Sequence, residues 1–289
     1  MNDGAAMSTP TAGTHISGDD FRKFREFFYR RTGIYFDDSK RYFVDKRITE
    51  RMELTGSDCF RDYFMLLRYE ADAAEMQALV NVMTVNETYF MREDYQFRCM
   101  TASMLPEIVK TNPPGRRLRI WSMPSSSGEE PYSIAIHLIE SWPGLAEHDV
   151  EIVASDIDTR MLEHARAGIY GRRAVQNLSP ALLERYFTRL SAGEYQVCQS
   201  LRESVRFTRV NLNDPRDTAS YKDFDIVFCR NLLIYFDDTS RASAAQTIFR
   251  ALRPGGFICL GHSESMARMS TLFTVRRFAD AIVYQRPLV

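Results

Sequence analysis

From residue 118 onward, short apolar runs alternate with stretches of helical periodicity, and this alternation limits the possible folds more than any other feature. Five runs have the length of buried strands: Leu118–Ser122, Val150–Ser155, Val205–Val210, Phe224–Cys229 and Phe257–Gly261. Strands separated by helices predict βαβ units and a mainly parallel α/β sheet. Two final runs, Thr274–Arg277 and Ala281–Gln285, are joined by a short turn and predict a closing antiparallel hairpin.

The alternation of strand and helix patterns in this sheet domain is interrupted over about residues 171–204. Within that stretch, Asn177–Leu190 has the pattern of one helix capped by Ser179, and Glu194–Gln199 has the pattern of an additional strand. We therefore expect a small β-subdomain inserted into the sheet domain.

The chain before the first strand is organised differently. Residues 1–18 are rich in Ala, Ser, Thr and Gly, which predicts a flexible tail. Residues 19–92 predict an all-α domain, residues 93–115 a linker helix and loop, and residues 116–289 the sheet domain. The helices before the sheet are expected over residues 19–32, 39–54, 60–69, 73–84 and 93–111.

Composition excludes several classes of function. The formal net charge of -1 does not indicate a general affinity for nucleic acids. The five cysteines are scattered without a C-x-x-C pair, and the histidines are dispersed, so neither a metal site nor a disulfide framework is expected. Free thiols suit a reducing cytoplasm. No apolar run approaches the ~20 residues of a membrane helix, so we expect no membrane insertion.

The strand–loop–helix segment from Trp121 to Ser133 carries the main chemical signal. Its small residues allow close approach of a ligand to the backbone at the carboxyl edge of the sheet. Ser127 and Glu130 have the spacing of a capping box. The loop lacks G-x-G-x-x-G and a Walker lysine, and Glu129 and Glu130 would repel phosphates. Two acids suit a ligand with an ammonium and hydroxyls, such as S-adenosylmethionine, although helix capping alone explains them equally well.

A second acidic position follows the next strand. Asp156 and Asp158 lie at its end, where an acid accepts hydrogen bonds from ribose hydroxyls in nucleotide-type folds. We favour Asp156 for ribose because it is nearer the strand, and Asp158 as the cap of the following helix.

Four segments together resemble the chemotaxis receptor methyltransferase (CheR) family. They are Asn86–Arg92, Ser127–Ser133, Ser155–Asp158 and Cys229–Phe236. The resemblance extends over nearly the whole chain from about Asp19. It implies a Rossmann-like S-adenosylmethionine methyltransferase domain with a small inserted β-subdomain, preceded by an all-α domain. The chain departs from the family at Met123-Pro124-Ser125, where members often have alanine, glycine or cysteine, and this bears on cofactor affinity.

The resemblance also implies which residues bind the cofactor. They are Asn86, Thr88, Arg92, Glu129, Asp156, Asn211, Leu212, Arg230 and Asn231. Glu129 would hold the methionine moiety, Asp156 the ribose, and Asn211-Leu212 would border the adenine. Without the family resemblance, the simpler interpretation is that Arg92 forms a surface ion pair and that Asn86 forms a turn.

The implied activity is that of a protein-glutamate O-methyltransferase acting on the cytoplasmic helices of bacterial chemoreceptors. A glutamate carboxylate is already ionised near neutral pH, with an ordinary pKa of ~4.3, so the enzyme needs to orient it rather than deprotonate it. Arg92 and Tyr235 are the candidates for this catalytic role. Tyr235 lies in an apolar run, which core packing would also explain.

Receptor docking is expected on the second helix. Lys40, Arg47 and Arg51 fall on one stripe, which a solvated helix face would also explain. The adjacent stripe, expected to be buried, holds Val44, Ile48 and Met52. We expect a monomer. Two other functions stay open: a nucleic-acid or small-molecule methyltransferase, and an adaptor that binds the cofactor without catalysis.

Overall fold

The computed structural model describes residues 16–70, 73–113, 115–190, 193–266 and 269–288. The chain forms two compact units. The helical unit comprises residues 1–31 and 35–84, and the sheet unit comprises residues 32–34 and 85–289. Most of the predicted tail, residues 1–15, lies outside the described residues.

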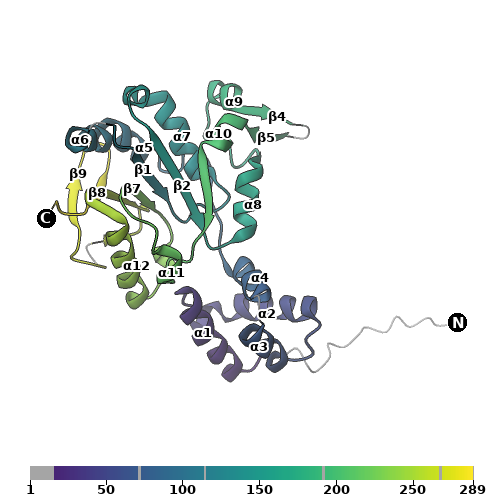
Figure 1. Cartoon of the computed structure of the whole chain (residues 1–289). Helices are drawn as coiled ribbons and strands as arrows, with labels where there is room; N and C mark the ends of the chain where they lie inside the picture. The colour runs from purple at the N-terminus through teal and green to yellow at the C-terminus, as the bar shows by residue number, and fades with distance from the viewer. Residues whose placement is uncertain (1–15, 71–72, 114, 191–192, 267–268, 289) are drawn as a thin grey trace. The chain divides into compact units, whose positions relative to one another are not determined.

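The described part of the helical unit consists of α-helices and a 3₁₀ turn (Figure 1). These are α1 (Gly18–Thr32), the 3₁₀ turn Asp38–Lys40, α2 (Arg41–Thr55), α3 (Phe60–Tyr69) and α4 (Ala74–Met83). Phe24 and Phe28 of α1 are fully buried, with ring centroids 5.5 Å apart. The stripe of α2 predicted to be buried is buried: Val44, Ile48 and Met52. Each such side chain contributes about 1.5–3 kcal/mol through burial.

The sheet unit is built on a seven-stranded sheet with the order β6-β2-β1-β7-β8-β10-β9. Its strands are β1 (Leu118–Ser122), β2 (Val150–Asp156), β6 (Val205–Arg209), β7 (Phe224–Cys229), β8 (Leu252–Leu260), β9 (Thr274–Arg277) and β10 (Ile282–Gln285). The first five strands of that order are parallel, and β10 pairs antiparallel with β8 and β9. The predicted α/β class and closing hairpin are therefore confirmed.

Helices cover both faces of this sheet (Figure 1). They are α5 (Tyr95–Cys99), a π-helical turn (Met100–Met104), α6 (Leu105–Thr111), α7 (Glu129–Ser141), α8 (Thr159–Ala167), α10 (Gln199–Glu203), α11 (Pro215–Thr218) and α12 (Asp238–Ala251). Ile120 of β1 packs into one apolar cluster with Phe97 and Tyr132, while its neighbour Trp121 packs into the other with Ala245. This alternation follows from the two-residue period of a strand. The predicted linker helix belongs to the sheet unit.

The insertion forms a small three-stranded antiparallel sheet in the order β3-β5-β4. Its elements are β3 (Ile169–Gly171), α9 (Pro180–Tyr186), β4 (Phe187–Arg189) and β5 (Glu194–Val197). Ser179 caps α9 as predicted. The predicted helix over 177–190 is wrong at its end, because Phe187–Arg189 pairs with β5 and strand pairing there overrides helical propensity.

Candidate functional site

The parallel strands end along one edge of the sheet, and the candidate site lies there. β1 and β7 are neighbours at the point where the strand order reverses, so the loops that follow them diverge. Open α/β sheets bind ligands in the crevice at such a switch point. Ser122, Asp156 and Cys229 are the last residues of β1, β2 and β7.

The loop after β1 turns tightly into α7 at Gly128. Gly128 has a φ of +96°, and a Cβ there would lie 2.8 Å from the Cβ of Ala165 in α8. The Tyr170 hydroxyl donates to the Ser127 carbonyl oxygen over 2.6 Å. The predicted capping box is wrong: Gly128 is the N-cap, and the Glu130 carboxylate instead accepts from the Ser122 hydroxyl, 2.8 Å away.

Asp156 ties this loop to the end of β2. Its carboxylate accepts from the backbone N–H of Ser126 at 2.7 Å and of Asp158 at 2.9 Å. The side chain is buried, and this burial raises the pKa of Asp156 to about 6, although the backbone donors act in the opposite direction. Asp158 caps α8 as predicted, accepting from the N–H groups of Arg160 and Met161.

Glu129 is the second buried acid at this edge. It is the first residue of α7 and is 4% exposed, and its carboxylate accepts from the Ser127 hydroxyl at 2.7 Å. Burial raises the pKa of Glu129 above its ordinary value. A cationic ligand group would offset that desolvation and favour the carboxylate.

Two hydroxyls in the same loop complete the polar lining. The Oγ atoms of Ser125 and Ser126 are buried and have no hydrogen-bond partner among the described residues. Buried polar groups normally have partners, so unsatisfied ones mark a place where a ligand or water binds. Two acids and two unsatisfied hydroxyls fit a ligand that carries an ammonium group and ribose hydroxyls, as S-adenosylmethionine does.

The segment before α5 lies against α7 and the start of α8. The Asn86 side chain donates to the Asp158 carboxylate over 3.0 Å, and the Met91 N–H donates to the Ser133 hydroxyl over 3.0 Å. Arg92 is half-buried, and its guanidinium donates to the Glu87 carbonyl oxygen over 2.7 Å. The surface ion-pair interpretation of Arg92 is not supported by these contacts.

Arg230 connects this segment to α7. Its side chain is 2% exposed and lies 3.1 Å from the Glu130 carboxylate and 3.4 Å from that of Glu93. It also donates to the Arg92 carbonyl oxygen over 2.6 Å. Glu93 in turn pairs with the exposed His262 at 2.9 Å. Burial alone would raise the pKa of Glu93, but Arg230 and His262 hold it below its ordinary value.

Glu264 is a site residue that the sequence interpretation missed. Its buried carboxylate accepts from the backbone N–H groups of Asn231, Leu233 and Gly261 at 2.7–2.8 Å. It thereby joins the loops after β7 and β8 and holds Asn231, whose φ is +57°. The available signal was an acid shortly after a strand end, the same signal that identified Asp156.

The other candidates for the sheet unit lie at the same edge with different exposure. Leu212 is buried in the core, and Asn211 is half-buried, with its side-chain oxygen accepting from the Asn213 N–H at 3.0 Å. Thr88 is half-buried. Tyr235 is 36% exposed, so the core-packing alternative is not supported. Burial raises the pKa of Tyr235, while the nearby charge of Arg92 acts to lower it.

The three docking candidates lie in the helical unit in different environments. Arg51 forms a two-point ion pair with the buried Glu75, with an Nε–Oε1 distance of 2.9 Å. Arg47 donates to the Val82 carbonyl oxygen over 3.1 Å. Lys40 is exposed and precedes α2. In the predicted stripe, Lys40 is therefore exposed and Arg47 is half-buried, while Arg51 is held within the helical unit by its ion pair with Glu75.

Comparison with known proteins identifies the family. The model of the CheR methyltransferase all-alpha domain matches residues 19–84, and that of the CheR methyltransferase SAM binding domain matches residues 86–282. The chain belongs to the CheR methyltransferase family. It is 50% identical to chemotaxis protein methyltransferase 2 of Vibrio cholerae, over 94% of both chains. It is 37% identical to the chemotaxis protein methyltransferase of Salmonella typhimurium, over 90% of this chain and 88% of that one.

Among the described residues, no helix combines the length and apolar character needed to cross a membrane. The same residues contain no group of three His, Cys, Asp or Glu side chains placed to hold a metal ion.

Proposed function

We propose that this member of the CheR family transfers the methyl group of S-adenosylmethionine to glutamate side-chain carboxylates of bacterial chemoreceptors. The observation that carries the proposal is the polar cradle at the edge of β1 and β2, formed by Glu129, Asp156 and the loop Ser125–Gly128. The relatives are named as chemotaxis protein methyltransferases, which supports a receptor as the substrate. We propose that the enzyme acts in the cytoplasm as a monomer.

The cofactor would be held mainly by the two buried acids. The Asp156 carboxylate accepts from the backbone N–H groups of Ser126 and Asp158, and its two oxygens together can also accept a hydrogen bond from a ribose hydroxyl. Glu129 is placed to pair with the ammonium of the methionine moiety. Asn86 would act through Asp158, which it contacts. The remaining members of the proposed set are Thr88, Arg92, Asn211, Leu212, Arg230 and Asn231.

The protein has two tasks beyond cofactor binding: to orient an ionised carboxylate and to exclude water. When bound, S-adenosylmethionine supplies an electrophilic methyl group on a sulfonium, which is also the leaving group. Arg92 would attract and orient one oxygen of the carboxylate, and the hydroxyl of Tyr235 would donate a hydrogen bond to the other oxygen. No general base is needed, because glutamate is ionised at neutral pH.

Arg230 would act as a positioning residue. It is buried among Glu93, Glu130 and the Arg92 carbonyl oxygen, and two ion pairs and one hydrogen bond hold its guanidinium in place. A charged residue held in this way fixes the backbone that presents Arg92.

The test is incubation of receptor-containing membranes with radiolabelled S-adenosylmethionine. Receptor label released by mild base is expected, since carboxyl esters are base-labile and N-methyl groups are not. Cofactor binding without transfer to receptor would instead favour the adaptor function. Base-stable label on nucleic acid would favour the nucleic-acid methyltransferase.

A further inference from the structure

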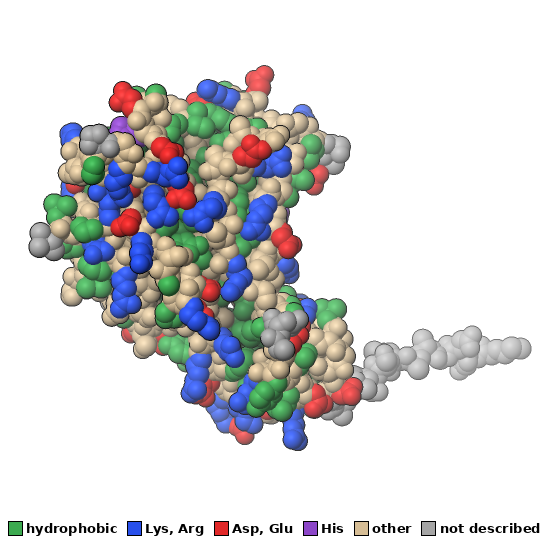
Figure 2. All heavy atoms as spheres, in the orientation of Figure 1, with side chains coloured by type: hydrophobic (Ala, Val, Ile, Leu, Met, Phe, Trp, Pro, Cys, Tyr) green, Lys and Arg blue, Asp and Glu red, His purple; other side chains and the backbone are tan. Residues whose placement is uncertain are grey.

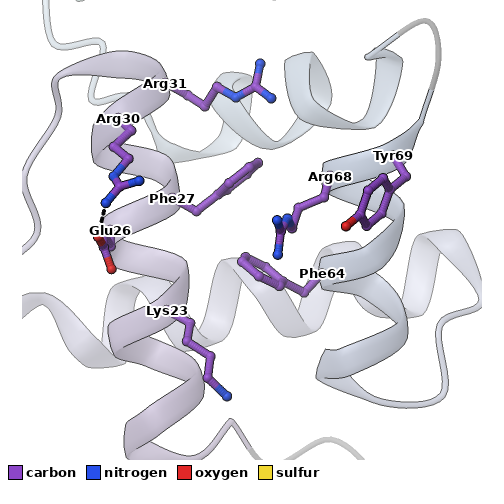
Figure 3. Close-up of a pocket in the computed structure, with 8 residues that line it drawn as sticks. All are labelled: Lys23, Glu26, Phe27, Arg30, Arg31, Phe64, Arg68 and Tyr69. Atoms are coloured by element: carbon purple, nitrogen blue, oxygen red, sulfur yellow. Dashed lines mark hydrogen bonds and ion pairs between the residues drawn. The ribbon is translucent and has the colours of Figure 1, made fainter.

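A groove of about 480 Å³ runs between α1 and α3 of the helical unit (Figure 3). The rings of Phe27 and Phe64 point into it from the two helices, with centroids 5.3 Å apart in an edge-to-face arrangement. Lys23 lies toward one end of the α1 side and Arg31 toward the other. The groove thus has an aromatic floor between charged ends.

Its charge is strongly positive compared with the chain as a whole. Four cations line it, Lys23, Arg30, Arg31 and Arg68, against the single acid Glu26, a surplus of three positive charges. The whole chain has a formal net charge of -1. The acid is paired with Arg30. No carboxylate of the described residues lies within ion-pair distance of Arg68, whose guanidinium stands 5.8 Å from the Phe64 ring centroid and 5.4 Å from that of Tyr69.

The groove also exposes aromatic surface. Tyr69 is 66% exposed, and Phe27 and Phe64 are half-buried. Figure 2 shows Lys, Arg and hydrophobic side chains side by side on the visible face of the helical unit. Aromatic residues and arginine together are enriched at the centres of protein interfaces, where they form the contacts that contribute most to binding. A purely solvated helix face does not require them.

We propose that this groove docks an acidic amphipathic helix from the cytoplasmic part of the chemoreceptor. An apolar side chain of that helix packs onto the Phe27 and Phe64 rings, and its carboxylates pair with Lys23 and Arg68. The nine residues from Lys23 to Arg31 span ~12 Å, enough for about two turns of a helix lying in the groove. The inference rests on the proposed function and moves receptor docking from the α2 stripe to the α1–α3 groove.

The experiment measures receptor methylation kinetics with a charge-reversed groove. Lys23→Glu with Arg68→Glu changes one exposed cation on each side. We expect the receptor KM to rise about tenfold, with kcat at saturating receptor and affinity for S-adenosylhomocysteine unchanged. The matched control is Arg22→Glu with Lys46→Glu, two exposed cations of the same unit outside the groove, for which KM should change less than about twofold.

Tyr69→Ser supplies a variant without a change in charge, and it should raise the receptor KM about threefold through lost aromatic contact. An unchanged KM in both groove variants, or an equal rise in the control, overturns the docking proposal. Neither result affects the methyltransferase assignment, because wild-type enzyme would still label the receptor. Absence of any labelling by wild-type enzyme would instead overturn the proposed function.

Discussion

Both units bury carboxylates, but they satisfy them in different ways. In the helical unit, Glu75 is 6% exposed and is held by side chains, the Arg51 guanidinium and the Tyr63 hydroxyl, with a Tyr63 Oη–Oε1 distance of 2.8 Å. In the sheet unit, Asp156 and Glu264 are held by backbone N–H groups of the loops they join. The first arrangement fastens helices together, and the second shapes loops at a sheet edge.

The two kinds of buried acid have different roles: the first stabilises the fold, and the second can bind a ligand. A buried acid paired with a buried cation is fully compensated within the fold and has little capacity for a ligand. A buried acid held by backbone N–H groups without a cation keeps a raised pKa, as Asp156 and Glu264 do, and an incoming cation or hydroxyl improves its environment. The predictions below test this contrast, beginning with the largest expected effect.

Arg51→Met should destabilise the helical unit by about 3–5 kcal/mol, because it leaves Glu75 buried and unpaired. Denaturant unfolding followed by far-ultraviolet circular dichroism measures the change. Arg51→Met with Glu75→Leu should recover most of the loss, since both charges are then removed. A small loss of stability in the single mutant would mean that the Arg51–Glu75 ion pair contributes little to the fold.

Asp156→Ala should weaken binding of S-adenosylhomocysteine by about 1.5–3 kcal/mol, the scale of a lost charge-assisted hydrogen bond. Calorimetry measures the affinity. Asp149→Ala is the matched control, because that acid is 61% exposed and pairs with the exposed Arg117. Unchanged affinity in a folded Asp156 variant would remove this residue from the site.

Acidification should weaken cofactor binding through the same carboxylate. The folded pKa of Asp156, about 6, is raised above its ordinary value of 3.8, so ionisation disfavours the folded state. Stability from this group is full below pH 3.8 and is lost as pH rises toward 6. Because the ligand prefers the ionised acid, the Kd should rise up to about tenfold per pH unit below the folded pKa. Asp156→Asn should flatten the dependence of Kd on pH. An equally steep dependence in that variant would mean that another group is the one that titrates.

Tyr235→Phe should lower kcat by a factor corresponding to about 1–2 kcal/mol, as expected for one neutral hydrogen bond, and leave cofactor affinity nearly intact. The pH–rate profile should keep both limbs, since the hydroxyl orients the carboxylate and takes no proton. Loss of a limb would indicate general-base catalysis. An unaltered kcat would mean that Tyr235 does not touch the acceptor.

Lys40→Glu with Arg47→Glu should have the smallest effect, a change of less than about twofold in receptor KM. Arg47 donates to the Val82 carbonyl oxygen, and Lys40 is an exposed cation that precedes α2. The same receptor assay applies. A rise larger than that of the groove variant would return docking to the α2 stripe.

Much of the fold was predictable because periodicity is local. β1, β7 and β9 have the predicted limits, and α3 has them as well. The site acids were partly predictable for the same reason, since Asp156 ends a strand and Glu129 begins a helix. The capping box failed because Gly128 approaches Ala165, a residue 37 positions away, and that contact selects a left-handed backbone.

The sequence by itself determined the strands of the parallel sheet and the acids Asp156 and Glu129 at its edge, because spacing along a few residues encodes them. Only the tertiary structure decided which charged side chains pair with one another. Arg230 meets Glu93 and Glu130, and Arg51 meets Glu75, across long separations in sequence. Strand register and helix packing set those contacts. A cation on a helical stripe therefore cannot be assigned to solvent, to a partner or to the core until the neighbouring helices are in place.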